Sequence, residues 1–164
     1  EEGITVAMYK PGRDAAAREY VASRLAPDLV PETARFDLPG RGMGSLQRFV
    51  EDAEDGEDYG PGVFSTAAVQ KLAVLDMRIL NLDRHTGNVL LLGGRGERDL
   101  LAIDHELSLP RLDELSRVTF CWKTWKQVQA PLVAEVAAQI RAIEVLKDLR
   151  LMNEAGLTVE HQLA

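Results

Sequence analysis

The sequence has 164 residues, of which 46% are hydrophobic and 27% are charged, and its formal net charge at pH 7 is -7. These values are typical of an ordinary globular protein and exclude a disordered, collagen-like or low-complexity chain. A chain of this length folds as one domain by default, with a core that needs no disulfide. The acidic balance argues against nucleic acid as the main partner, because binding to phosphates needs clustered lysine and arginine.

The cysteine content and the hydropathy pattern indicate where the protein works. A single cysteine, Cys121, cannot form an internal disulfide, so we expect a reducing, intracellular compartment. No apolar run approaches the ~20 residues that span a bilayer, and no signal peptide is visible. We therefore expect no transmembrane segment and a localisation that is cytoplasmic or peripheral to a membrane. Because the first residue is not methionine, we also expect the chain to be part of a longer protein or a larger assembly.

The N-terminal third is predicted to contain a strand and a helix, followed by a loop. Residues 4–9 are apolar and β-branched and lead to a Pro-Gly turn, which puts Lys10 at the end of the strand. The alanine-rich run 14–25 predicts a helix. Residues 36–44, with one proline and three glycines, predict a loop, and Ser45 is a candidate N-cap for a helix that begins there.

The middle of the chain is predicted to contain a helix and a hairpin. Ser65 or Thr66 is a candidate N-cap for a helix over residues 67–80, whose apolar residues form a broad face. Residues 89–92 and 100–103 are apolar runs on either side of a glycine-rich turn, which predicts a β-hairpin. The sum of these elements is a mixed α+β domain.

Other stretches favour ordinary structural roles. Six acidic residues between positions 51 and 58 predict a solvated loop, because their spacing does not fit an EF-hand calcium loop. Apolar residues recur at helical spacing from about 131 to 153 and predict a helical C-terminus with a buried stripe. Trp122 and Trp125 are expected to belong to the core rather than to a membrane-binding patch.

Five residues occur in the order and context that phosphoryl transfer requires. Such a reaction needs an acid that orients the attacking hydroxyl, and a second acid with an asparagine to hold the metal ions on the triphosphate. Asp83, then Asn88, and Asp104 after the predicted hairpin match this kinase arrangement. Lys10 at the end of the first strand stands where a phosphate-binding lysine belongs, and Glu19 on the following helix is placed to pair with it. The set predicts kinase chemistry or kinase ancestry.

The same residues resemble a known family. Most protein kinases have the order His-Arg-Asp, whereas this chain has Asp83-Arg84-His85. It also has Asp104-His105 where those kinases have Asp-Phe. Both features resemble the phosphatidylinositol 3-/4-kinase superfamily. Over about residues 6–151 the chain most resembles the plant-type gamma phosphatidylinositol 4-kinases. The segments that carry this resemblance include Ala7-Met8-Tyr9-Lys10-Pro11, Val30-Pro31-Glu32-Thr33, Gly44-Ser45-Leu46-Gln47, Leu75 through Asn81, Asp83 through Asn88, Ile103-Asp104-His105 and Cys121 through Pro131.

The resemblance implies a fold, cofactors and substrates. The fold would be a protein-kinase-like α+β catalytic domain, with a reduced N-lobe and hinge in residues 1–50 and a C-lobe in residues 51–164. The cofactors would be ATP and Mg²⁺ or Mn²⁺. The acceptor would be a phosphoinositide lipid or a protein, because members of the gamma group are reported to phosphorylate proteins as well as, or instead of, lipids. The best candidates for binding an acidic headgroup are Arg111, Arg117 and Lys123, which lie where an activation segment would run.

The resemblance also implies a role for each residue of the motif. Lys10 would contact the nucleotide phosphates, and Glu19 would hold Lys10 in place by an ion pair. Asp83 would orient the acceptor hydroxyl, and His85 would stabilise charge on the transferring phosphoryl group.

The remaining implied roles concern the metal and the adenine. Asn88 and Asp104 would bind Mg²⁺ or Mn²⁺. The stretch 44–49, including Leu46 and Gln47, would form the hinge against which adenine packs.

Three departures from the family pattern support an alternative function. No glycine-rich loop precedes Lys10, the segment between Thr33 and Gly44 is short for the usual pair of strands, and Glu106 stands where the family has glycine. The first hypothesis is therefore an ATP-dependent phosphotransferase acting on a phosphatidylinositol headgroup or a protein Ser/Thr hydroxyl. The alternative is a degenerate kinase-like domain that serves as an interaction module in a larger assembly.

Three polar residues beside the motifs are expected to be structural. His105 is interpreted as a packing or loop-orienting residue. Asp76 and Arg78, on the central helix, are interpreted as a buried hydrogen-bonded pair or a helix cap.

Overall fold

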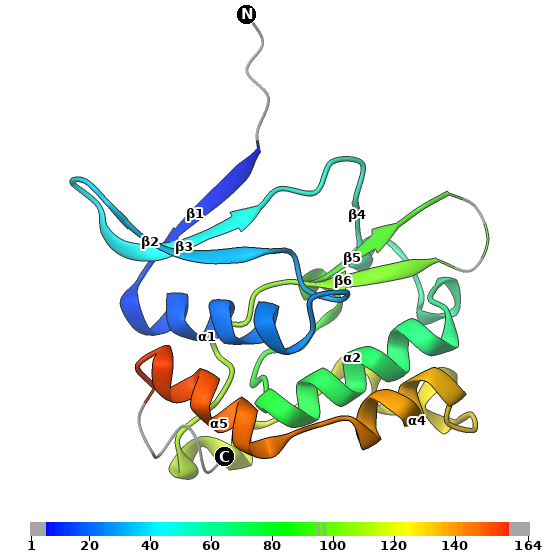
Figure 1. Ribbon diagram of the computed structural model, residues 1–164. Coiled ribbons are helices and arrows are strands. Elements are labelled where there is room, and N and C mark those ends of the chain that lie inside the picture. Colours follow the sequence, from blue (N-terminus) through cyan, green and yellow to red (C-terminus); the bar gives the residue numbers. More distant parts are fainter. Residues whose placement is uncertain (1–5, 95, 97, 158–164) are drawn as a thin grey trace, which may run out of the picture.

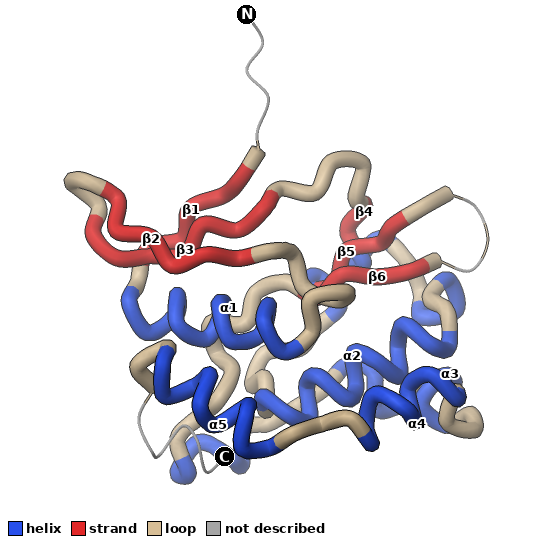
Figure 2. The backbone as a smooth tube through the Cα atoms, viewed as in Figure 1, coloured by secondary structure: helices blue, strands red, loops and turns tan. Residues whose placement is uncertain are grey.

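The computed structural model describes residues 6–94, 96 and 98–157. Two three-stranded antiparallel sheets lie along one side of the molecule, and the helices lie on the other side (Figure 1). Figure 2 shows the same separation of strands and helices along the backbone. This mixed content agrees with the expected α+β class.

The first sheet has strands β1 (Ala7–Pro11), β2 (Thr33–Leu38) and β3 (Gly42–Arg48) in the order β1-β3-β2. Helix α1 (Arg13–Leu25) connects β1 to β2 and lies beneath this sheet (Figure 1). The strand and helix predicted at the N-terminus are therefore confirmed, and Lys10 is the residue before the last one of β1.

Strands β2 and β3 correct two sequence-based expectations. The loop expected at 36–44 and the helix expected from Ser45 are wrong, because these residues form an antiparallel hairpin in which Phe36 pairs with Gly44. Gly40 and Gly42 have φ angles of 78° and 82°, so they form a tight turn between strands rather than an open loop. The segment between Thr33 and Gly44 was expected to be too short for a pair of strands, but strands β2 and β3 are both present.

The second sheet consists of β4 (Glu54–Asp55), β5 (Val89–Leu92) and β6 (Asp99–Ala102), in that order. Strands β5 and β6 confirm the predicted hairpin. The acidic segment 51–58 is only partly a loop, because Glu54 in β4 pairs with Leu91 in β5.

Helix α2 (Thr66–Ile79) confirms the predicted central helix. The Ser65 hydroxyl is its N-cap and accepts a hydrogen bond from the backbone N–H of Ala68 at 3.1 Å. The later helices are α3 (Lys126–Gln129), α4 (Ala134–Arg141) and α5 (Val145–Glu154). Short 3-10 helices lie at Gly56–Asp58, Pro61–Val63, Thr86–Asn88, Leu112–Arg117 and Cys121–Thr124.

The C-terminus is helical as predicted, but the buried stripe expected along it is wrong in part. Val136 in α4 is fully buried, whereas Ile140 and Leu146 are 40% and 69% exposed. The break between α4 and α5 puts Leu146 out of phase with α4. Ile140 lies one turn after Val136 on the same face of α4, but it is at the end of the helix and stays partly exposed.

A single core contains side chains from most of the chain. Buried apolar residues of α1, α2, β5 and β6 pack together with Trp122 and Trp125, which confirms that the two tryptophans are core residues. The division into an N-lobe of residues 1–50 and a C-lobe of residues 51–164 stays a prediction. No helix in the described part of the chain is long and apolar enough to cross a membrane.

The end of the described chain returns to the first sheet. Met152 in α5 and Leu157 after it are buried in the same core as α1. Arg35 of β2 donates a hydrogen bond from Nη1 to the carbonyl oxygen of Ala155 at 2.8 Å. Helix α5 therefore lies next to α1 (Figure 1) and supports it from below.

Candidate functional site

The lysine at the end of β1 is paired on two sides. The Nζ atom of Lys10 lies 2.9 Å from Oε1 of Glu19 on α1, which is the ion pair predicted from the sequence. The same Nζ lies 3.3 Å from Oδ1 of Asp104, which follows β6. Burial lowers the pKa of Lys10, but the nearby carboxylates of Glu19 and Asp104 outweigh burial and raise it. The amine is therefore a cation, held where the two sheets meet.

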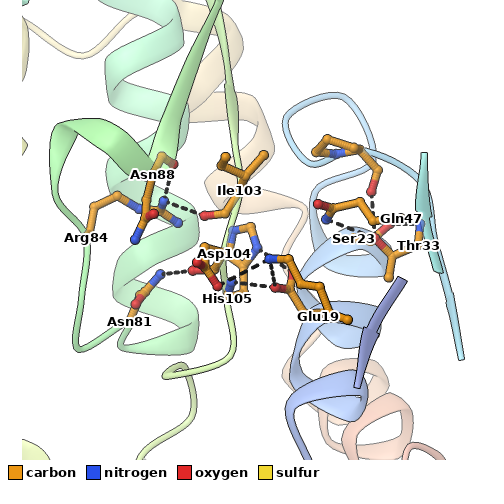
Figure 3. A network of polar contacts seen from close by, with 12 residues as sticks. Glu19, Ser23, Thr33, Gln47, Asn81, Arg84, Asn88, Ile103, Asp104 and His105 are labelled. Atoms are coloured by element: carbon orange, nitrogen blue, oxygen red, sulfur yellow. Dashed lines mark hydrogen bonds and ion pairs between the residues drawn. The ribbon is translucent and has the colours of Figure 1, made fainter. Parts of the chain in front are cut away.

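Glu19 is the centre of a buried network (Figure 3). Its side chain is 1% exposed, and Oε1 also accepts a hydrogen bond from the backbone N–H of His105 at 3.1 Å. Its other oxygen, Oε2, lies 3.2 Å from Nδ1 of His105. Burial by itself raises the pKa of Glu19, but the contacts with His105 and Lys10 outweigh burial and lower the pKa to about 2. Glu19 is therefore a carboxylate at neutral pH.

His105 is the buried packing residue that the sequence predicts. Its side chain is fully buried, and burial lowers the pKa of the imidazole despite the contact with Glu19. We assign the proton of the neutral ring to Nδ1, because that nitrogen faces the carboxylate. The residue after Asp104 is thereby tied to α1.

Hydrogen bonds fix the loop that carries Asp83. The Oδ1 atom of Asn81 accepts the backbone N–H of Asp83 at 2.9 Å, and Nδ2 of Asn88 donates to the carbonyl oxygen of Asp83 at 2.9 Å. Asn81 also donates from Nδ2 to the carbonyl oxygen of Asp104 at 3.3 Å (Figure 3). One asparagine therefore joins the Asp83 loop to the Asp104 loop.

Arg84 is a buried arginine beneath both loops. Its Nε lies 3.1 Å from the carboxylate oxygens of Asp76. Its Nη1 donates to the carbonyl oxygens of Asn88 at 2.6 Å and Ile103 at 2.9 Å (Figure 3). The residues before and after the β5–β6 hairpin are thus held by one guanidinium.

The partner of Asp76 corrects a further expectation. The pairing expected between Asp76 and Arg78 is wrong, because Asp76 pairs with Arg84 and accepts a hydrogen bond from Trp122 Nε1 at 2.8 Å. Arg78 points instead toward α5, where Nη2 is 2.6 Å from Oδ2 of Asp148. Residues two positions apart on a helix project in different directions, which explains the separate partners.

Asp83 and His85 lie together at the surface. Their side chains are 57% and 51% exposed, and Nε2 of His85 is 3.8 Å from Oδ2 of Asp83. The Nδ1 atom of His85 accepts the backbone N–H of Gly87 at 3.1 Å, so the neutral ring carries its proton on the nitrogen that faces Asp83. Both side chains are accessible to a substrate.

Two oxygen donors suit a divalent cation at this site. Nδ2 of Asn88 donates to the carbonyl oxygen of Asp83, so Oδ1 of Asn88 is available as a metal ligand. Asp104 supplies a partly exposed carboxylate. The described residues contain no group of three or more His, Cys, Asp or Glu placed to hold a metal. Asn88 and Asp104 therefore fit a Mg²⁺ ion that takes its other ligands from phosphates and water, which is how this ion is usually bound.

Leu46 and Gln47 do not contact the group formed by Lys10, Glu19 and Asp104. Gln47 is buried in a different hydrogen bond, from Nε2 to Oγ1 of Thr33 at 3.2 Å (Figure 3). Leu46 pairs with Tyr9 and not with Lys10, so it lies on the other face of the sheet. The adenine contacts predicted for these two residues stay a prediction.

Two cavities in the described part of the chain are lined by other residues. One of about 830 Å³ is bordered by Phe49, Val50 and Glu51 after β3 and by Leu101 of β6. Another of about 300 Å³ lies between α2 and the α4–α5 connection. Neither cavity is lined by the residues that the sequence places at the phosphates. Of these, Lys10, Asp83, His85 and Asp104 are partly exposed, and Asn88 is buried.

The segment after Asp104 contains two features singled out in the sequence. Glu106 is exposed and its φ is outside the left-handed region, so its backbone does not require glycine. Arg111 lies 3.5 Å from Asp113, and Arg117 lies 2.9 Å from Glu114. Their proposed contact with an acidic headgroup, together with that of Lys123, stays a prediction.

Sequence reasoning missed Asn81 and Arg84 as residues that hold the site together. Arg84 had a usable signal, because an aspartate within the apolar face of a helix, here Asp76, requires a buried cation nearby. Asn81 had none, since its contacts with Asp83 and Asp104 depend on how two loops meet.

Comparisons with known proteins find one matching family model and several related proteins. A family model described as phosphatidylinositol 3- and 4-kinase matches residues 15–163. Phosphatidylinositol 4-kinase gamma 4 of Oryza sativa subsp. japonica is 39% identical over 141 residues, which are 82% of this chain and 25% of that protein. Phosphatidylinositol 4-kinase gamma 4 of Arabidopsis thaliana is 38% identical over 115 residues, which are 70% of this chain and 20% of that protein. The chain thus spans a quarter or less of the length of these relatives.

Proposed function

The chain belongs to the phosphatidylinositol 3- and 4-kinase family, and from this we propose that it is an ATP-dependent phosphotransferase. It transfers the γ-phosphate of ATP to the hydroxyl of a phosphatidylinositol headgroup or of a protein serine or threonine. In this proposal residues 1–50 form the N-lobe and hinge and residues 51–164 form the C-lobe. The protein acts in the cytoplasm or at a membrane surface, as one part of a larger assembly.

The position of Lys10 Nζ is the observation that carries the proposal. It lies 2.9 Å from Glu19 and 3.3 Å from Asp104, so a cation for the phosphates stands beside a carboxylate for the metal. These residues come from β1, α1 and the loop after β6, so three segments far apart in the sequence converge on one amine.

Each residue then has a task in the transfer. Lys10 binds the phosphates, and Asp83 orients the acceptor hydroxyl and accepts its proton. Nε2 of His85 lies on the side of the ring that faces Asp83, and its proton stabilises charge on the transferring phosphoryl group. Asn88 and Asp104 hold Mg²⁺ or Mn²⁺, which when bound neutralises the phosphates as they separate.

The alternative, a degenerate domain that serves as an interaction module, loses one of its supports, because the β2–β3 hairpin is present. The backbone at Glu106 accepts a side chain, and the negative charge that Glu106 adds near Asp104 still supports the alternative. The position of Lys10 Nζ between Glu19 and Asp104 makes the active enzyme the preferred proposal.

Nucleotide binding is the first test. Calorimetry with ATP should show binding that requires Mg²⁺, and Asp104→Asn should lose that requirement together with most of the affinity. The control is Asp113→Asn, an exposed aspartate beyond the site. Absence of binding by the wild-type protein at millimolar ATP and Mg²⁺ would contradict the proposal and favour the interaction module.

A further inference from the structure

The imidazole of His105 has one polar contact in the described part of the chain. Its Nδ1 is 3.2 Å from Oε2 of Glu19, while its Nε2 is buried without a hydrogen-bond partner there. Burying a ring nitrogen without a hydrogen-bond partner costs free energy. The contact with Glu19 is the polar interaction that offsets this cost.

The carboxylate of Glu19 depends on this contact. Oε1 is bound by Lys10 Nζ at 2.9 Å and by the backbone N–H of His105 at 3.1 Å. Among the residues that the structure describes, the imidazole alone donates to Oε2. Without the ring, Oε2 would be a buried carboxylate oxygen without a donor, and the carboxylate would turn to share Lys10 between its oxygens. Lys10 would then be drawn away from Asp104.

We infer that His105 is a positioning residue, whose imidazole orients the Glu19 carboxylate and thereby places the Lys10 amine for the nucleotide phosphates. The inference rests on the proposed function, because it assigns a task within that site. This role explains why a histidine directly follows Asp104. The loop that carries the proposed metal ligand then also fixes the position of the Lys10 amine.

The test replaces the imidazole in the purified protein. His105→Phe keeps a planar ring without a donor, whereas His105→Asn keeps a donor nitrogen the same number of bonds from the backbone. Loss of one hydrogen bond to a charged group predicts that His105→Phe raises the KM for MgATP about tenfold with little change in kcat. His105→Asn should restore most of the KM. In a Glu19→Gln background, His105→Phe should raise the KM no further.

A second measurement does not depend on nucleotide. The rate at which an amine-acylating reagent modifies Lys10, followed by mass spectrometry, should fall several-fold in His105→Phe, because the amine is drawn toward the buried Glu19 and away from the partly exposed Asp104. The rate should stay near the wild-type value in His105→Asn. Failure of the wild-type protein to bind MgATP would contradict the proposed function, whereas equal Lys10 modification in all three proteins would overturn this inference alone.

Two controls separate positioning from general destabilisation. Val136→Ala shortens a fully buried side chain on α4, which packs against α2 rather than α1, and an equal rise of KM in that variant would overturn the inference. Should His105→Phe fail to fold, His105→Gln replaces it, because its amide is one bond too long for the contact. Equal KM values in His105→Gln and His105→Asn would then overturn the inference.

Discussion

Asp83 and Arg84 are neighbours in the sequence, but their side chains have opposite environments. The Asp83 carboxylate is 57% exposed and is held through its backbone by Asn81 and Asn88. The Arg84 side chain is fully buried and makes the contacts that support the loop from below. At the scale of single residues, we therefore expect a substitution of Asp83 to lower the rate of phosphoryl transfer and a substitution of Arg84 to lower the stability of the fold.

Asp83→Asn should lower the rate of phosphoryl transfer by at least about 100-fold, because an amide does not accept the proton of the acceptor hydroxyl. The affinity for MgATP should stay close to that of the wild type, since Asp83 does not contact Lys10 or Asp104. Transfer is measured with radiolabelled ATP and affinity by calorimetry. Wild-type turnover in this variant would remove Asp83 from the proposed mechanism.

Arg84→Met should destabilise the protein by about 3 to 5 kcal/mol, because it leaves Asp76 as an uncompensated buried charge. The double variant Asp76→Leu with Arg84→Met should lose less than the two single variants together. Urea unfolding measures these values. Arg117→Met is the control, since an exposed pair contributes less than about 1 kcal/mol. Equal losses in the two arginine variants would show that the Arg84 network is not structural.

At the scale of elements, the β1–β3 contact decides where Lys10 lies. A Cβ atom added to Gly44 would be 2.3 Å from the carbonyl oxygen of Lys10, which is closer than the two atoms can approach. Glycine in β3 therefore allows the strand that carries the lysine to pair without distortion.

Gly44→Ala should destabilise the protein by about 1 to 3 kcal/mol through overpacking, and it should weaken MgATP binding because β1 must shift. Gly60→Ala is the matched control, since a Cβ there meets open space and the backbone is extended. Thermal unfolding and calorimetry measure the two effects. If both alanine variants behave alike, the close approach of β1 and β3 has no consequence for the lysine.

At the scale of the whole molecule, Glu19 joins α1, β1 and the loop after β6 through one carboxylate. Helix α5 reinforces this junction, because its C-terminal end packs in the core beside α1 and its following carbonyl binds Arg35 of β2. The relative positions of the two sheets therefore depend on ionised groups as well as on apolar packing.

The pKa of Glu19 is lowered from 4.5 to about 2, so its folded form binds protons less readily than its unfolded form. Its contribution to stability is therefore complete above pH 4.5 and is lost as the pH falls toward 2. The shift corresponds to about 3 kcal/mol. Denaturant unfolding between pH 6 and pH 2 should show a smaller loss in Glu19→Gln than in the wild type, and parallel curves would contradict this.

Local patterns were sufficient for β1, α1, α2 and the β5–β6 hairpin, because each has a clear periodicity and clear end signals. They failed for β2 and β3, since glycine and proline mark both an open loop and a tight turn between short strands. They also failed in part for the C-terminal stripe, because the break between α4 and α5 puts Leu146 out of phase with the buried face of α4.

The sequence by itself determined the family and the order of Lys10, Glu19, Asp83, Asn88 and Asp104, because those identities and spacings are local and chemical. Only the tertiary structure decided the partners of the buried charges. Asp76 binds Arg84 rather than Arg78, and Glu19 binds His105 across 86 positions of the chain. The reason is that desolvation makes a buried charge depend on whichever group the fold brings within hydrogen-bond distance, and spacing along the chain does not define that distance.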